Sequence, residues 1–352
     1  MKKQLFILVM TLVINVNLNG QVPKIKWWYD LKDVSFGNAA SADLDKDGKP
    51  EIVFSTYRND SSLYCLNAED GSLLWKFNTG GCNDVAPTIY DVNNDDTLEV
   101  ILPSSCVAKT FCFNGVTGRK IWEAMSNGSD SPPTLGDLDN DGKMEILHGE
   151  FGGTVRCLNA ENGSLNYAFD VDPNSWIQTE PVILDLDGNG QLDFFVANWS
   201  FGTNDAFFAY RGDDHSLLWE QHYPKDVMYH GASFGDLDHD GKPELAIGSY
   251  DGWLYVMNGE DGSLLLKDSI PVYGGYIGSP TSMGDIDGDG EMEIVVTSAH
   301  MVAAVSLTDS IEWTYSMPGF GHSFRGAALS DLDGDSLLDV GVGIMAKYQL
   351  VA

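Results

Sequence analysis

Positive charge is scarce in this sequence. Its 352 residues contain 20 lysines and arginines against 52 aspartates and glutamates, which gives a formal net charge of −32 at pH 7. Such an acidic excess repels phosphate backbones and anionic lipid headgroups, so neither nucleic acid nor insertion into a membrane is expected. The acidic side chains must either be solvated on the surface or be gathered around cations.

Long apolar runs are also lacking. The only extended one, Leu5 to Val16, follows Lys2 and Lys3 and is too short to cross a bilayer. A charged start, a short apolar stretch and a small polar exit are typical of a secretory signal peptide. We therefore expect residues 1–20 to be a signal peptide, residues 21–352 to form one domain, and the protein to be secreted or held at the cell surface.

Cysteine is rare, and no helical period of useful length follows the signal. Cys65, Cys112 and Cys157 occupy equivalent positions in a repeat, which predicts buried strand residues. Cys82 and Cys106 flank the second repeat and could meet in a disulfide of an exported protein. The 38 glycines and 13 prolines indicate many short strands joined by tight turns.

What the sequence does contain is one nine-residue acidic loop that occurs seven times. The first copy reads D-L-D-K-D-G-K-P-E, and successive copies begin 46 to 51 residues apart. Short apolar segments flank each copy, and two more strand-like segments follow, the last often containing a tryptophan. Four strands in each unit of this length are the signature of a propeller blade. The predicted fold is an all-β, seven-bladed β-propeller with four-stranded antiparallel blades.

The two ends of the chain predict how the ring closes. The sequence stops at Tyr348–Ala352, which matches the third strand of a blade, so blade seven lacks a fourth strand. Residues 27–31, W-W-Y-D-L, match the fourth-strand pattern instead. We expect this N-terminal strand to complete blade seven, which leaves no long edge unpaired.

The acidic loops predict calcium sites. Side chains at loop positions 1, 3 and 5 can converge on one point, an acid at position 9 can close the shell, and glycine at position 6 permits the necessary positive φ. The expected ligands, grouped by position, are Asp43, Asp91, Asp137, Asp185, Asp236, Asp285 and Asp331; Asp45, Asn93, Asp139, Asp187, Asp238, Asp287 and Asp333; Asp47, Asp95, Asp141, Asn189, Asp240, Asp289 and Asp335; and Glu51, Glu99, Glu145, Asp193, Glu244, Glu293 and Asp339. Up to seven calcium ions are expected.

Three loops depart from the pattern and are predicted to bind calcium more weakly. Loop two has Asn93 at position 3 and Asp96 where glycine is wanted. Loop four has Asn189 at position 5, and loop seven has Ser336 at the glycine position.

These loops resemble the FG-GAP/VCBS repeats of the integrin α-subunit head and of many secreted bacterial proteins. The segments V-A-P-T, S-P-P-T and G-S-P-T are the closest relics of the tag that names the repeat. The resemblance implies a seven-bladed propeller with calcium in the loops between the first two strands of each blade. The L-Y-C-L-N-A-E-D-G-S-L-L-W stretch is also similar to quinoprotein repeats, but the adjacent cysteine pair of quinone sites is absent. No quinone or other organic cofactor is expected.

Recognition is expected on the face opposite the calcium loops, where aromatic rings and a few polar groups are concentrated. Such a surface suits sugar rings or a peptide segment. The candidate ligand-face residues are Trp176, Trp199, Tyr229, His230, Trp253, Tyr276, His300, His322 and Arg325. An alternative is that several of these side chains only plug the central channel.

Three functions follow from this reading. The favoured one is a monomeric binding or adhesion module for an extracellular glycan or protein. The second is a polysaccharide lyase, with His230, His300 or His322 as base near Arg325 or calcium. The third is a structural spacer within a larger secreted protein. No catalytic triad, nucleotide loop or zinc spacing is present in the sequence, and His148, His215 and His239 are expected to face solvent in turns.

Overall fold

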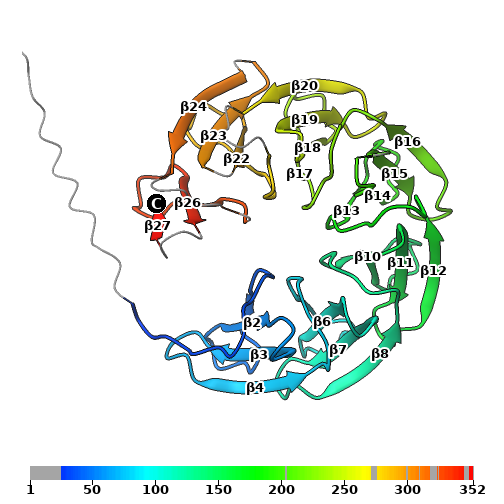
Figure 1. Cartoon of the computed structure of the whole chain (residues 1–352), viewed down its shortest axis with the longest axis vertical. Helices are drawn as coiled ribbons and strands as arrows, with labels where there is room; N and C mark the ends of the chain where they lie inside the picture. The colour runs from blue at the N-terminus through cyan, green and yellow to red at the C-terminus, as the bar shows by residue number, and fades with distance from the viewer. Residues whose placement is uncertain are drawn as a thin grey trace, which may run out of the picture.

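The computed structural model describes residues 25–202, 204–270, 276–298, 300–308, 310–317, 323, 325–344 and 349–351. Over these residues seven antiparallel sheets follow one another in sequence and are arranged in a ring around a central axis (Figure 1). The described part of the chain contains no helix, and so none that could cross a membrane. The predicted all-β, seven-bladed propeller is confirmed, whereas the predicted signal segment lies outside the described residues.

Each blade begins next to the axis and ends at the rim. The short first strands are β1 (Ala40–Ala42), β5 (Thr88–Tyr90), β9 (Thr134–Gly136), β13 (Val182–Leu184), β17 (Ser233–Gly235), β21 (Ser282–Gly284) and β25 (Ala328–Ser330). The second strands are β2 (Glu51–Ser55), β6 (Glu99–Ser104), β10 (Glu145–Gly149), β14 (Asp193–Ala197), β18 (Glu244–Gly248), β22 (Glu293–Thr297) and β26 (Asp339–Ile344).

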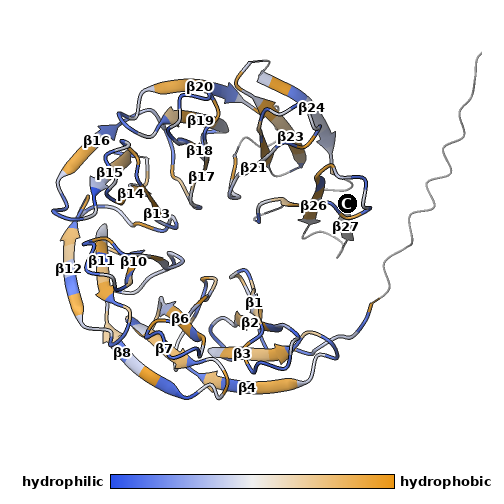
Figure 2. Cartoon of the chain, turned by 180° about the vertical axis from the view of Figure 1, so that it is seen from behind, coloured by the Kyte–Doolittle hydropathy of each residue, from blue (hydrophilic) through white to orange (hydrophobic). Residues whose placement is uncertain are grey.

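The outer half of each blade completes the sheet. The third strands are β3 (Ser62–Asn67), β7 (Lys109–Asn114), β11 (Thr154–Asn159), β15 (Phe207–Arg211), β19 (Trp253–Asn258), β23 (Met301–Ser306) and β27 (Gln349–Val351). The fourth strands are β4 (Leu73–Asn78), β8 (Lys120–Met125), β12 (Leu165–Asp170), β16 (Leu217–Gln221), β20 (Leu264–Ser269) and β24 (Ser310–Ser316). Second strands such as β10 and β14 are buried throughout, whereas fourth strands alternate between exposed and covered residues (Figure 2).

The hydrophobic core is divided into layers between neighbouring blades. One cluster, for example, joins Val53 and Trp75 of blade one to Val100 and Phe113 of blade two. Five further clusters join blades two through seven in the same way. Among the described residues no such cluster joins blade seven to blade one. Blades two to six therefore bury both faces against their neighbours, as propeller geometry requires.

In blades one, two and four, a tryptophan of the fourth strand packs on the next blade. Trp75 Nε1 donates a hydrogen bond to the Gly115 carbonyl oxygen (2.6 Å), and its ring lies against Gly118. Gly118 has φ 64°, and a Cβ there would come within 2.6 Å of the indole. The same arrangement recurs for Trp122 with Gly163 and for Trp219 with Gly262. The tryptophan and glycine of the outer repeat are therefore explained by packing between blades.

The predicted ring closure is seen only in part. The last sheet has three described strands, in the order β25-β26-β27, and no ladder joins them to the N-terminal segment within the described residues. Trp27 nevertheless donates from Nε1 to the Ala68 carbonyl oxygen (2.8 Å) and packs on Gly71, the contact that Trp75 makes on blade two. The N-terminal segment thus occupies the fourth-strand position relative to blade one, without a visible strand pairing to blade seven.

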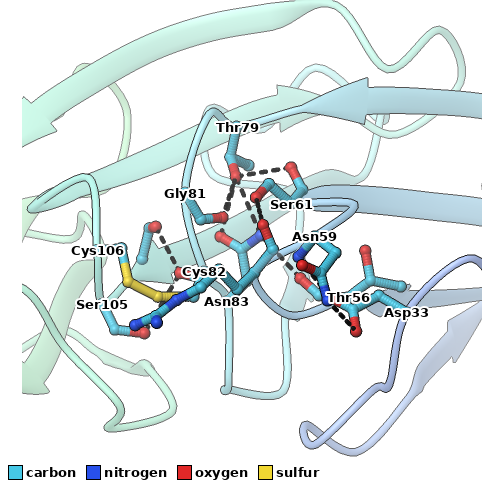
Figure 3. Close-up of a disulfide and its surroundings, with 12 residues drawn as sticks. Asp33, Thr56, Asn59, Ser61, Thr79, Gly81, Cys82, Asn83, Ser105 and Cys106 are labelled. Atoms are coloured by element: carbon cyan, nitrogen blue, oxygen red, sulfur yellow. Dashed lines mark hydrogen bonds between the residues drawn. A yellow bond between two sulfur atoms is a disulfide. The ribbon is translucent and has the colours of Figure 1, made fainter.

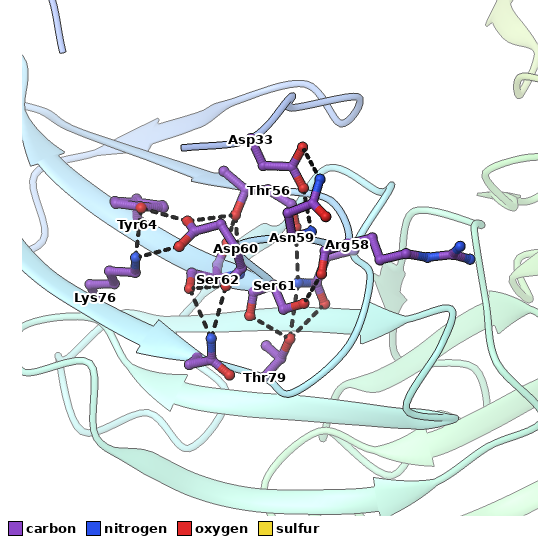
Figure 4. A network of polar contacts seen from close by, with 12 residues as sticks. Asp33, Thr56, Arg58, Asn59, Asp60, Ser61, Ser62, Tyr64, Lys76 and Thr79 are labelled. Atoms are coloured by element: carbon purple, nitrogen blue, oxygen red, sulfur yellow. Dashed lines mark hydrogen bonds and ion pairs between the residues drawn. The ribbon is translucent and has the colours of Figure 1, made fainter. Parts of the chain in front are cut away.

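Polar contacts fasten this segment to blade one (Figure 4). Asp33 Oδ2 accepts a hydrogen bond from the backbone N–H of Asn59 (2.5 Å), and Tyr57 N–H donates to the Val34 carbonyl oxygen (2.9 Å). In the same loop Asp60 accepts from the Tyr64 hydroxyl (2.5 Å) and forms an ion pair with Lys76 on β4 (2.7 Å). The loop between β2 and β3 is therefore held from both sides.

The cysteine predictions agree with the structure. Cys82 and Cys106 form a disulfide, with their Cα atoms 5.1 Å apart. Cys65, Cys112 and Cys157 are free and fully buried in third strands. Burial raises the pKa of each of these thiols, to about 12 for Cys65 and Cys157, so they are packing residues rather than nucleophiles.

Candidate functional site

The acidic loops connect the first and second strands of every blade, and their backbones fold in the same way. In the first loop, Asp43 Oδ2 accepts from the Gly48 N–H (3.0 Å) and Asp45 Oδ1 accepts from the Asp47 N–H (3.2 Å). Asp47 Oδ1 in turn accepts from the Lys49 N–H (2.9 Å). All seven loops repeat these three contacts, so each chain turn is wrapped around its own carboxylates.

The acid at position 9 begins the second strand and points back into the loop. Glu51 accepts through Oε2 from the Leu44 N–H (2.7 Å), while its Oε1 is buried and has no hydrogen-bond partner. The contact to the position-2 N–H recurs in all seven loops. Buried oxygens without a partner recur at Glu99, Asp193 and Glu244, and at the position-1 residues Asp137 and Asp236.

In five of the loops, carboxylate oxygens of the loop acids lie close enough together to share one ion. One carboxylate oxygen from each of Asp43, Asp45 and Glu51 lies within 4.8 Å of the others. Equivalent clusters form at Asp137, Asp139 and Glu145, at Asp185, Asp187 and Asp193, at Asp236, Asp238 and Glu244, and at Asp285, Asp287 and Asp289. A buried unpaired carboxylate oxygen is costly, and a hard divalent cation with oxygen ligands would satisfy it. The donor set therefore fits calcium.

Electrostatics agree with this fit. Burial, reinforced by the other loop acids, raises the pKa of Glu99 and Glu145 to about 7 and that of Asp193 to about 6. The pKa values of Glu51, Glu244 and Glu293 are raised for the same reason. In these six loops the ionised form of the position-9 acid is therefore disfavoured, and a bound cation would stabilise it.

The three atypical loops keep the shape of the others, and two of them do so under backbone strain. Position 6 has positive φ in every loop, including 65° at Asp96 and 77° at Ser336, where glycine would be relaxed. Position 4 also has positive φ, as at Lys46 and Asn94, a requirement that the sequence pattern did not reveal. Loops two and seven therefore carry a conformational cost that the glycine loops avoid.

An arginine on the third strand of blade four reaches into loop four. Arg211 is the residue of β15 that pairs with Asp193, and Asn258 takes the corresponding place opposite Glu244 in blade five. Arg211 Nη2 donates to Asp187 Oδ2 over 2.9 Å. The guanidinium thus neutralises part of the charge of loop four, at a position where blades one, two, three and five have asparagine.

The opposite face of the ring carries the aromatic residues. Because strands alternate in direction, the loops between second and third strands and the connections between blades all lie at the end away from the acidic loops. Ring contacts link seven side chains from these segments into one row, which we call the aromatic surface: Phe151, Trp176, Trp199, Phe201, Tyr229, Tyr250 and Tyr276.

Neighbouring rings in the aromatic surface lie 4.9 to 6.4 Å apart between centroids. Trp176 also forms isolated backbone bridges to Phe151 and Trp199, which tie the connection between blades three and four to both blades. The rings are half-buried, and Phe201 is 58% exposed. The row therefore presents aromatic area to solvent rather than filling the core.

A polar cavity of about 60 Å³ lies beside this surface, at the axis, and we call it the axial pocket. Every residue that lines it belongs to a segment leading into the first strand of a blade. They are Asn38, Asp84, Val85, Ala86, Asp130, Pro132, Glu180, Tyr229, His230, Gly231, Pro280 and Arg325. Tyr229 belongs both to the pocket and to the aromatic surface, so the two features are continuous.

The predicted ligand-face residues divide into three groups. Trp176, Trp199, Tyr229 and Tyr276 lie in the aromatic surface, and His230 and Arg325 line the axial pocket. Two others lie elsewhere. Trp253 starts β19, with the Lys267 ammonium 4.7 Å from its ring centroid, and His300 lies in the loop before β23, outside the pocket lining. His322 lies outside the described residues.

Sequence reasoning missed Phe151 and the three acids of the axial pocket. Asp84 and Asp130 each stand four residues before a first strand, just ahead of the V-A-P-T and S-P-P-T segments, and Glu180 precedes Pro181 in the next blade. An acid recurring ahead of the repeat's proline was therefore the signal that could have found them.

The expectation that three histidines face solvent was wrong in two cases. His148 is fully buried in β10, with its Nε2 2.9 Å from Thr110 Oγ1, and burial lowers its pKa. His215 stacks on Tyr167, with ring centroids 3.5 Å apart. Only His239 is exposed, beside Glu291. The first two positions occur where β-strand packing, invisible in the local sequence, covers the ring.

Comparison with known proteins supports the fold and the repeat. Residues 185–247 match the FG-GAP-like repeat family. This match spans the acidic loops of blades four and five. No curated protein matches the sequence significantly.

Solved structures similar to this chain are propeller-like. BamB from Moraxella catarrhalis has a TM-score of 0.63 and 15% identity, and the alignment covers 91% of this chain and 83% of that one. The V. cholerae biofilm matrix protein Bap1 has a TM-score of 0.66 and 15% identity over 94% and 83% of the two chains. A europium-containing methanol dehydrogenase has a TM-score of 0.62 and 12% identity over 87% and 72%. At such identities the similarity shows the fold alone.

Proposed function

We propose that the chain is a secreted, calcium-binding β-propeller that binds an extracellular saccharide on its aromatic surface. The row of half-buried rings from blades three to six carries this proposal. Rings that served only the core would be fully covered, whereas six of these are half-buried and Phe201 is exposed. Aromatic faces stack on the apolar faces of sugar rings, and rigid side chains lose little entropy on binding.

Calcium has a structural part in this proposal. The acidic loops lie at the opposite end of every blade, so bound ions would hold the first two strands together without touching the ligand. Binding to the folded loops stabilises the folded state by mass action. Calcium removal should therefore weaken saccharide binding only through loss of structure.

Three features of the chain support the proposal that it is exported. The N-terminal residues have the pattern of a secretory signal, the Cys82–Cys106 disulfide suits an oxidising compartment, and extracellular calcium concentrations suit weak oxygen-ligand sites. Secretion followed by loss of residues 1–20 can be checked by mass spectrometry of the protein recovered from the medium of the expressing cell.

A lyase activity is less well supported. His230 and Arg325 do line one cavity, which satisfies part of the requirement for a base beside a charge-neutralising group. However, the cavity is too small for a sugar ring, and Asp84, Asp130 and Glu180 would repel the uronic acid that such an enzyme cleaves. We therefore favour binding without catalysis.

A glycan array probed with the calcium-loaded protein tests the proposal. Trp199→Ala and Phe201→Ala should each abolish binding, while Trp313→Ala, which removes an exposed tryptophan on β24 away from the surface, should leave it unchanged. Unaltered binding in the first two variants would contradict the proposal. Capture of no glycan, with capture of a protein instead, would replace saccharide by a protein ligand, and no ligand at all would favour the spacer.

A further inference from the structure

More acidic than basic side chains line the axial pocket. Asp84, Asp130 and Glu180 line it together with one guanidinium, that of Arg325. Burial and the neighbouring Asp130 raise the pKa of Asp84 to about 7, and burial raises the pKa of Asp130, whereas Glu180, which also lines the pocket, is exposed. Arg325 is itself held in a buried position that lowers its pKa. The pocket as built therefore favours an additional positive charge.

Two oxygens in the pocket have no partner within the protein. Asp84 Oδ1 and Asp130 Oδ1 are buried and accept no hydrogen bond. The other oxygen of Asp130 accepts from Gln178 Nε2 over 3.1 Å, which fixes the orientation of the carboxylate. A donor placed in the cavity could satisfy both free oxygens, and a charged donor would do so most strongly.

The segment that carries Asp84 is held rigidly (Figure 3). Cys82 is tied to Cys106 by the disulfide, and its carbonyl oxygen accepts from Ser104 Oγ (2.9 Å). Asn83 donates from Nδ2 to Thr79 Oγ1 (3.0 Å). A carboxylate on such a frame is pre-organised, so little ordering entropy is lost when a ligand binds.

The size of the cavity limits what can enter. A volume of about 60 Å³ has room for a few water-sized groups, and an ammonium group is of that size, whereas a sugar ring is not. Outside the cavity, Tyr229 packs against Trp199 and Tyr250, with ring centroids 5.8 and 6.4 Å apart. A ring stacked on these aromatics could therefore reach into the pocket with one substituent.

We propose that the ligand is an amine-bearing saccharide, whose ring stacks on the aromatic surface and whose ammonium group enters the axial pocket between Asp84 and Asp130. This inference rests on the proposed saccharide-binding function and names the class of saccharide. Three carboxyl groups against one guanidinium select a cation, because a bound ammonium group would favour their ionised forms. The ring of Tyr229, which also lines the pocket, could add a cation–π contact. Neutral or acidic sugars gain neither contribution.

Paired oligosaccharides that differ only at nitrogen test this selection. Titration calorimetry at about pH 6.5, where sugar amines are largely charged, compares a β-1,4-linked glucosamine hexamer with its N-acetylated counterpart in saturating calcium. We expect the amine form to bind about tenfold more tightly or better, equivalent to about 1.4 kcal/mol. Asp130→Asn and Glu180→Gln should each remove most of that preference. The control Glu312→Gln, which deletes an exposed charge on β24, should retain it.

The possible outcomes separate this inference from the function on which it rests. Equal binding of both hexamers, lost in Trp199→Ala, would overturn the amine preference and leave saccharide binding intact. Binding of a lysine peptide but of neither hexamer would overturn the saccharide. Weakening of amine binding by calcium added beyond saturation of the acidic loops would make the pocket a metal site instead. Melting curves of the two pocket variants in calcium confirm that they are folded when binding is scored.

Discussion

Arg211 points its guanidinium into the acidic loop of its own blade, with Nη2 2.9 Å from Asp187 Oδ2. Blades one, two, three and five have asparagine at this register position, so blade four alone among these five supplies a tethered cation to its loop. This contact adds a second reason, beyond Asn189 at position 5, for the prediction that loop four binds calcium more weakly than the regular loops.

Replacing that cation should strengthen calcium binding in loop four. In Arg211→Asn the Asp187 carboxylate is released, and the calcium affinity of this loop should rise about fivefold or more. Calorimetric titration with calcium measures it. The reverse change in blade five, Asn258→Arg, is the matched control and should weaken loop five. If Arg211→Asn leaves every calcium affinity unaltered, the guanidinium does not compete with the ion.

Calcium removal should change the effect of Glu51→Gln on protein stability from destabilising to neutral or stabilising. Glu51 has one oxygen bonded to the Leu44 N–H and one buried without a partner. In calcium, Glu51→Gln loses a ligand and should destabilise the protein by about 1–3 kcal/mol. In chelator the same change removes an unneutralised buried charge, so the variant should be at least as stable as the parent. Urea unfolding under both conditions measures the two effects, and destabilisation of the same size in each would rule out a metal ligand.

The stability of the axial pocket should depend on pH. The pKa of Asp84 is raised to about 7 by burial and by Asp130, so the folded state favours its protonated form. The corresponding stability is present below the ordinary pKa of an aspartate and is lost as pH rises through about 7. Asp84→Asn should therefore raise the melting temperature by roughly 2 °C or more at about pH 8 and by little at about pH 4. A gain of equal size at both pH values would contradict this account.

The contact between fourth-strand tryptophans and glycines should be sensitive to a single methyl group. A Cβ at Gly118 would lie within 2.6 Å of the Trp75 ring and at φ 64°, so Gly118→Ala should cost about 3 kcal/mol, from strain and overpacking together. Gly80 has φ 85° but open space around it, so Gly80→Ala should cost only the backbone term of about 1 kcal/mol. Equal costs in urea unfolding would show that the indole contact contributes nothing.

The sequence alone predicted the parts of the molecule that repeat. Seven copies of one acidic loop, with alternating strands around them, indicated the number of blades, the strand order and, in four loops, the convergence of the acids at positions 1, 3 and 9. These features depend on the backbone geometry of a turn and on the alternation of side chains along a strand, and short stretches of sequence encode both. Cys82 and Cys106 could be paired for the same reason, since both flank one repeat.

Contacts between residues that are distant in sequence became visible only in the tertiary structure. Asp84, Asp130 and Glu180 are far apart in sequence and meet because seven inner segments approach one axis. Arg211 reaches Asp187 through strand pairing, and His148 is buried by the neighbouring blade through Thr110. Phe151 joins the aromatic surface through a bridge to the next connection. Contacts of this kind depend on the packing of one blade on another and on the closing of the ring, and no local periodicity encodes them.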